Sequence, residues 1–215
     1  MDGHLLRFRT DVTYALIDLE TFNLNLSFHF NRPWQVGILI ARGEKVIDGK
    51  DIRINWPDAP HLKIGDEAAR ITHFDPVMHN KLAITAQSAF ERFWPLLESA
   101  DYIMMHNGLR FDLYLLKDYA KMMGKPWQWM VPKIIDTNAV AKGIKMGIPF
   151  KPKDGSFIEY QYRMADIMAK GVKTSLSTLG KEYGISHDYD RLHDAIVDLE
   201  LNLKVWNKLK YQVDI

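Results

Sequence analysis

The order of apolar and polar residues along the chain predicts three strands near its start. Residues 12–19 form a short, apolar and β-rich run, as expected of a buried strand. Residues 34–41 and 46–54 have strand-like patterns, and the segment 42–44 between them is typical of a tight turn. Strands joined by such short connections pair antiparallel, so we predict an antiparallel meander.

The rest of the chain changes to helical spacing interrupted by short apolar runs. In residues 85–99, apolar side chains recur every three or four positions, which predicts an amphipathic helix that Pro95 kinks or ends. Strands first, followed by alternating strands and helices, predict an α/β domain on a mixed sheet. Buried strands are predicted at 101–105 and 134–135, and further helices at 111–123, 175–182 and 194–209.

Residues 142–173 have the least regular pattern. This stretch contains seven Lys and Arg residues against three Asp and Glu residues. We interpret it as a basic insertion or mobile loop within a single domain that spans residues 1–215. Its charge fits either a track for a phosphate backbone or a solvated, lysine-rich loop.

Composition excludes several classes of protein. The hydrophobic share is 47%, which suits a chain that buries a full core, and the formal net charge is only +1. The sequence has no cysteine, which excludes disulfides, thiolate metal sites and cysteine nucleophiles. A bound metal must therefore be held by oxygen or imidazole ligands, and carboxylates favour Mg²⁺ or Mn²⁺.

Two carboxylates stand at the end of the first predicted strand. Side chains two apart on a strand point to the same face, so Asp18 and Glu20 are expected to face one spot. Apolar residues precede them, which places the pair at the edge of the core. Carboxylates this close repel each other, and a cation relieves the repulsion. The alternative is that they are ordinary solvated acids where a strand leaves the core.

Two further acids occupy comparable positions. Asp112 follows a predicted buried strand and a glycine-containing turn, and it lies in the first turn of a helix. At the start of the last long helix, Asp194 is the expected N-cap, so His193 should fold over toward Asp198. The alternatives are a carboxylate that complements the helix dipole and a histidine with no role at a helix entrance.

Together the three segments favour one catalytic site. Each places an acid where a core element ends, and four carboxylates with one histidine suffice for two-metal phosphodiester cleavage. One ion lowers the pKa of the attacking water, and an imidazole accepts its proton.

The segments 18–21, 106–112 and 193–198 resemble the three motifs of the DEDD exonuclease superfamily. The match is to its histidine-bearing (DEDDh, DnaQ-like) subgroup, because the alternative subgroup has a tyrosine where this chain has Asp194. Over about residues 12–210 the chain is most similar to the nuclease domain of bacterial exonuclease I. Further matching segments occur in the expected order at 20–22, 31–35, 67–72, 135–137, 176–179 and 183–185.

The resemblance implies a ribonuclease H-like fold, with a five-stranded mixed sheet flanked by α-helices. The implied activity is stepwise 3′→5′ hydrolysis that releases nucleoside 5′-monophosphates. It assigns His193 as the general base. Two Mg²⁺ or Mn²⁺ ions are expected on Asp18, Glu20, Asp112 and Asp198. Candidate contacts to the terminal nucleotide are Thr21, Phe22, Asn107 and Phe111, and the alternative for the two phenylalanines is packing in the core.

Single-stranded DNA is the favoured substrate. The alternatives are RNA or oligoribonucleotides, a proofreading subunit with a polymerase or other replication partner, a non-enzymatic binding module and a metal-free scaffold. Exonuclease I has further domains after its nuclease domain and this chain ends at residue 215, so highly processive digestion is not expected. The polar N-terminus lacks a signal-peptide pattern, no apolar run reaches membrane-spanning length, and we expect a cytoplasmic protein of a bacterium or phage-infected cell.

Overall fold

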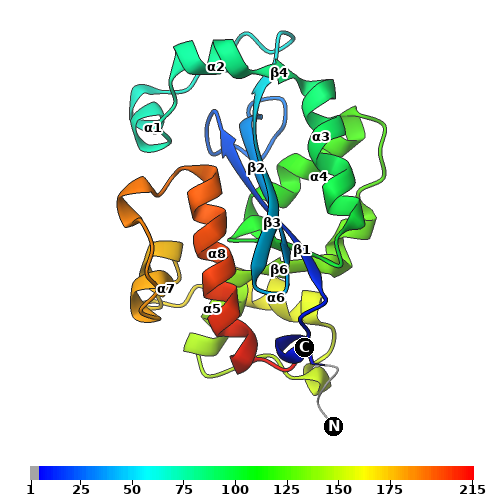
Figure 1. The fold of residues 1–215 in the computed structure, drawn as a ribbon, viewed down its shortest axis with the longest axis vertical. Coiled ribbons are helices and arrows are strands. Elements are labelled where there is room, and N and C mark those ends of the chain that lie inside the picture. The colour runs from blue at the N-terminus through cyan, green and yellow to red at the C-terminus, as the bar shows by residue number, and fades with distance from the viewer. Residues whose placement is uncertain (1–4) are drawn as a thin grey trace.

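The computed structural model describes residues 5–215 and is built on one mixed sheet (Figure 1). Within that range the strand order is β4-β3-β2-β1-β5-β6. Neighbouring strands in the meander β1–β2–β3 run antiparallel, as predicted, whereas β5 and β6 extend the sheet in parallel from β1. The strands are β1 (Thr13–Thr21), β2 (Pro33–Arg42), β3 (Lys45–Asn55), β4 (Ile84–Thr85), β5 (Tyr102–Met105) and β6 (Ile134–Asp136).

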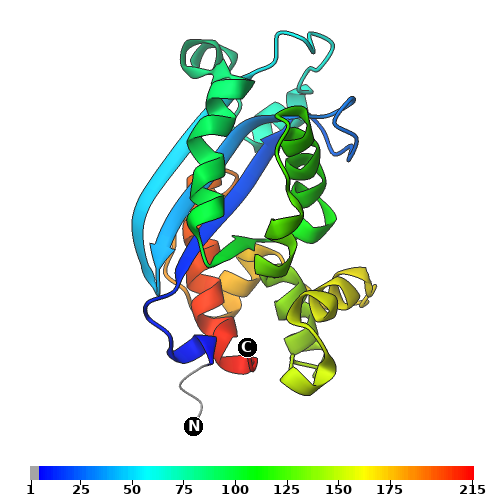
Figure 2. The same cartoon turned by 90° about the vertical axis from the view of Figure 1, so that its right-hand side faces the viewer.

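Helices cover both faces of the sheet, which confirms the predicted α/β class. Figure 2 looks onto the face covered by α3 and α4, and α8 lies against the opposite face. The strands β3, β2, β1, β5 and β6 correspond to the five expected, and the two-residue β4 adds a sixth. The helices are α1 (Asp66–Ile71), α2 (Pro76–Leu82), α3 (Ala86–Ser99), α4 (Asp112–Met122), α5 (Thr137–Lys145), α6 (Phe157–Asp166), α7 (Leu176–Glu182) and α8 (Ala195–Leu209).

The alternation of β1 divides the core in two. Ala15, Ile17 and Leu19 pack into the cluster under α3 and α4, whereas Tyr14 and Leu16 pack into the cluster under α5, α7 and α8. Both clusters are closed by buried apolar helix faces, including Phe93 of α3 and Trp206 of α8.

The stretch 142–173 is more regular than we expected. It includes the end of α5 and the whole of α6, whose N-terminus has a capping box formed by Ser156 and Glu159. Gln161 of α6 is buried and hydrogen-bonds to the backbone of β6 through Ile134 and Asp136. Residues 157–166 are therefore a packed helix rather than a mobile loop, while 167–175 has no helix or strand.

Several short elements have no counterpart in the sequence prediction. Helices α1 and α2 precede β4, and α1 buries none of its residues, so it carries no strong apolar periodicity. Helix α5 buries small residues such as Ala139 and Ala141, and Gly143 interrupts its pattern. No helix in residues 5–215 combines the length and apolarity needed to cross a membrane.

Candidate active site

The first strand brings two carboxylates to the face that α8 covers. Asp18 and Glu20 continue the alternating series of Tyr14 and Leu16, so they point toward α8 at the place where the apolar contacts end. Both line a cavity of about 480 Å³. The predicted shared orientation of the two side chains follows directly from the period of the strand.

The start of α8 supplies the third carboxylate and the histidine. Asp194 caps the helix by accepting a hydrogen bond from the Ile196 N–H at 3.2 Å. His193 adopts left-handed backbone with φ of 71°, and its N–H lies 3.3 Å from both carboxylate oxygens of Asp198. The turn therefore folds position 193 back over Asp198, and both residues line the cavity.

A glycine on β2 lets α8 approach the sheet at this point. Gly37 is the register partner of Asp18 on the neighbouring strand. A side-chain carbon at Gly37 would lie 2.7 Å from the Cβ of Ala195, the first residue of α8. The missing side chain thus sets how close the helix, and with it Asp198, lies to Asp18.

Replacing Gly37 with serine is expected to destabilise the protein, because the Ala195 methyl group cannot swing away. Overpacking of this kind costs about 1–3 kcal/mol. Urea denaturation measures the change in the free energy of unfolding. Gly65→Ser is the matched control, since nothing lies within 4 Å of a side-chain carbon built at Gly65. Equal stability of the two variants would contradict the close approach of α8 to β2.

The fourth carboxylate lies beneath the cavity rather than on its wall. Asp112 is the first residue of α4, which confirms its predicted place in the first helical turn, and its side chain is buried. Its Oδ1 accepts a hydrogen bond from the Leu19 N–H at 3.1 Å. Because Leu19 separates Asp18 from Glu20, this bond fixes the buried carboxylate directly against the pair on β1.

A buried acid that the sequence analysis did not assign to the site holds the turn between β5 and α4. The carboxylate of Asp136 accepts hydrogen bonds from the N–H groups of Asn107 and Leu109 at 3.0 Å, and it caps α5 by accepting from Asn138 and Ala139. Its position at the end of β6 was the available signal, because parallel strands end at one edge of a sheet. Asp136 thereby connects the second motif to β6.

The predicted nucleotide contacts do not all reach the cavity. Asn107 lines it, in left-handed backbone with φ of 66°. Thr21 is buried, and its hydroxyl donates to the Asn23 carbonyl at 2.6 Å, while Phe22 and Phe111 are partly buried against the core. The wall also contains polar side chains that were not predicted as contacts: His106, Asn138, Ser175 and Ser177.

Burial raises the pKa of every carboxylate in the group, and repulsion from other members of the group raises the pKa of Asp18 and Glu20 further. Burial, and then the charges of its three partners, raise the pKa of Asp18 well above its ordinary value. Burial is the main cause that raises the pKa of Glu20 to about 8 and that of Asp112 to about 7, and the pKa of Asp198 is also raised. In the described residues, none of the four forms an ion pair with a Lys, Arg or His.

This donor set suits a hard divalent cation. Four carboxylates converge without a balancing cation from the chain, and oxygen donors are what Mg²⁺ and Mn²⁺ prefer. Across residues 5–215, no three His, Asp or Glu side chains are already grouped for metal binding. Holding an ion therefore requires these carboxylates to come closer together than they are in this structure.

The metal-free protein is expected to lose stability as the pH rises. Since the pKa of Glu20 rises from 4.5 to about 8 on folding, the folded state holds a proton that the unfolded state releases between about pH 4.5 and 8. In chelator, Glu20→Gln should therefore melt above the unsubstituted protein at pH 8, with the difference shrinking toward pH 5. Thermal unfolding at both pH values measures this, and a difference independent of pH would contradict it.

Known structures share this architecture. The E. coli exonuclease I–single-stranded DNA complex with bound zinc superposes with a TM-score of 0.72 at 19% identity, over 94% of this chain and 41% of that one. The fold is ribonuclease H-like. A product-bound exonuclease I superposes with a TM-score of 0.70 at 19% identity, over 94% of this chain and 44% of that one. This chain thus spans about two fifths of the length of these proteins. No protein-family model and no curated protein sequence matches the chain.

Proposed function

We propose that this protein is a two-metal 3′→5′ exonuclease that hydrolyses single-stranded DNA from its 3′ end and releases nucleoside 5′-monophosphates. The observation that carries the proposal is the convergence of Asp18, Glu20, Asp112 and Asp198, from β1, α4 and α8, around a cavity whose mouth also has His193. Acids with raised pKa values that meet in one cleft are typical of a functional site.

The proposed division of labour follows from the contacts of each residue. Asp18, Glu20, Asp112 and Asp198 would hold two divalent ions, which would supply Lewis-acid stabilisation of the phosphate and a water of lowered pKa. The Leu19 N–H orients Asp112, and the His193 N–H orients Asp198, so backbone donors hold two of the four carboxylates. The His193 side chain is exposed at the cavity, where its imidazole is free to accept the proton of the water.

Single-stranded DNA is the substrate that the structural likeness supports best, because exonuclease I structures of this fold contain DNA oligonucleotides. Asn107 is the predicted nucleotide contact that lines the cavity, and Ser175 and Asn138 add polar groups beside the carboxylates. The stacking roles of Phe22 and Phe111, and the contact from Thr21, remain predictions. Oligoribonucleotides are the alternative substrate, since such polar groups also suit a 2′-hydroxyl.

A gel time course on matched DNA and RNA single strands, labelled at the 5′ end, tests this proposal. With Mg²⁺ or Mn²⁺ we expect a ladder that shortens from the 3′ end, faster for DNA, and that chelator abolishes. A faster ladder on RNA would replace the DNA assignment with the oligoribonucleotide alternative. Absence of cleavage by folded protein on both strands would refute the exonuclease proposal.

A further inference from the structure

A second cavity opens beside the active-site cavity. It has a volume of about 800 Å³ and shares Asn138 with the active-site cavity. Thr174 lines the second cavity and Ser175, the next residue, lines the first. We call the second cavity the basic groove; its lining includes Arg110, Asn138, Lys142, Met168, Lys170 and Thr174.

The charge of the basic groove is of one sign. Three cationic side chains line it, from Arg110, Lys142 and Lys170, and none of its lining residues is an Asp or Glu. Arg110 contacts Asp166 at 3.2 Å, but both side chains are more than half exposed, so this pair screens little of the positive charge. Next to a cavity surrounded by four carboxylates, the groove is a separate region that attracts anions.

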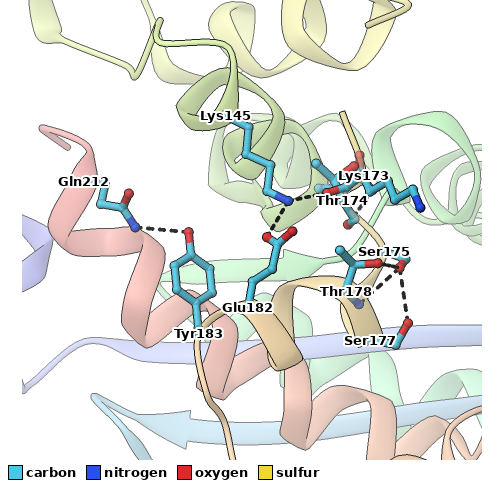
Figure 3. Close-up of polar contacts among 10 residues, drawn as sticks. Lys145, Lys173, Thr174, Ser175, Ser177, Thr178, Glu182, Tyr183 and Gln212 are labelled. Atoms are coloured by element: carbon cyan, nitrogen blue, oxygen red, sulfur yellow. Dashed lines mark hydrogen bonds and ion pairs between the residues drawn. The ribbon is translucent and has the colours of Figure 1, made fainter. Parts of the chain in front are cut away.

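The loop that forms one wall of the groove is held at both ends. At its start, Arg110 and Lys142 donate to the Ala165 carbonyl, and Lys142 also donates to that of Ile167. At its end, Asn138 donates to the Thr174 carbonyl at 3.2 Å. Figure 3 shows Lys145 reaching both Glu182 and the backbone of Lys173, beside the hydroxyl cluster of Ser175, Ser177 and Thr178.

Between these anchors the loop presents an apolar side chain beside a cation. Met168 is 98% exposed, and Lys170 is exposed close by in the chain. A flexible thioether packs readily against flat rings, and an ammonium group pairs with phosphate. Phosphates flanked by planar bases are the combination that single-stranded nucleic acid offers.

We propose that the basic groove binds the single strand on the 5′ side of the nucleotide being removed, with Lys170 and Arg110 on its phosphates and Met168 against a base. This rests on the proposed function, because the strand enters the groove only if its 3′ end lies among the carboxylates. Asn138, on the wall of both cavities, lies where the strand passes from one to the other.

The test compares a long and a minimal substrate in the double variant Met168→Ser, Lys170→Glu. The long substrate is a single strand of about twelve thymidines, which spans both sites. The minimal substrate is the p-nitrophenyl ester of thymidine 5′-monophosphate, which has no upstream phosphate. We expect kcat/KM to fall about tenfold on the long strand at low salt, with a salt dependence shallower by about 0.7 in log–log slope. Hydrolysis of the ester should not change.

Lys81→Glu provides the matched control, since Lys81 is exposed on α2 and lines neither cavity. An equal fall on both substrates would overturn the proposal, because the loop would then act on the active site itself. An unchanged kcat/KM of the double variant on both substrates would also overturn the proposal. If the unsubstituted protein hydrolyses neither substrate, the proposed function fails. Fluorescence anisotropy of the labelled strand in chelator then tests the groove alone, which is refuted if the double variant binds as tightly as Lys81→Glu.

Discussion

Replacing Asp18 with asparagine is expected to reduce the rate of 3′→5′ hydrolysis by about a thousandfold or more. Asp18 lies among the other three acids, and the charges of all three raise its pKa. Asp18 is thus the carboxylate best placed to contact both proposed ions. Removing its charge forfeits several kcal/mol of transition-state stabilisation. Asparagine keeps the shape of the side chain and removes its charge. Single-turnover kinetics on 5′-labelled DNA measures the loss.

The Asp18→Asn variant, although inactive, is expected to be more stable than the unsubstituted protein in the absence of metal. Asparagine removes a buried charge that its neighbours repel, so the melting temperature in chelator should rise while activity disappears. Asp66→Asn is the matched control, because Asp66 is exposed on α1, far from the acids in sequence. Near-normal activity of Asp18→Asn would exclude the proposed metal centre, whatever the melting temperature.

Replacing His193 with asparagine is expected to reduce kcat by about 10²- to 10⁴-fold, the usual contribution of a general base. The substitution is chosen for the backbone: φ at this position is 71°, and asparagine adopts left-handed conformation more readily than most residues. The N–H that contacts Asp198 belongs to the backbone and is retained. Binding of Mn²⁺, measured by calorimetry, should therefore change little.

A reduced kcat with unchanged Mn²⁺ binding would distinguish a general base from a histidine that only holds the site together. His61→Asn is the control, since His61 is exposed, hydrogen-bonds to the His29 carbonyl and does not line the active-site cavity. A His193→Asn variant that loses Mn²⁺ binding together with activity would assign the histidine a role in holding the site instead. Full activity would remove it from the mechanism.

The parts of the site that follow local rules were predictable from sequence. The period of β1 puts Asp18 and Glu20 on one face, and the preference of aspartate for helix N-caps identifies Asp194 and hence the fold-back of His193. The burial of Asp112 against Leu19, in contrast, could not be predicted from local rules. Its partner is 93 positions away, and no spacing rule links them. Their encounter depends on β5 lying beside β1, which only the resemblance to known nucleases implied.

The residues that escaped prediction have roles set by tertiary contacts. Asp136 ends a three-residue strand, which periodicity hardly detects, and its importance lies in its hydrogen bonds to a turn that is distant in sequence. Helix α6 was not predicted because lysines flank it on both sides and the whole stretch was interpreted by its charge. In the fold, Gln161 fixes this helix to β6. Phe22 and Phe111, assigned to the nucleotide by analogy, are partly buried against the core, and their contact with a nucleotide stays a prediction.

The most direct test of the account is a crystal structure of the protein with Mn²⁺ and a thymidine dinucleotide, using anomalous scattering to locate the metal. The account predicts two peaks about 3.5–4 Å apart, held by Asp18, Glu20, Asp112 and Asp198, which have turned inward from their present positions. The scissile phosphate should lie between them, and His193 should face the attacking water. An absence of manganese from this cavity, or ions held by other residues, would contradict the proposed active site.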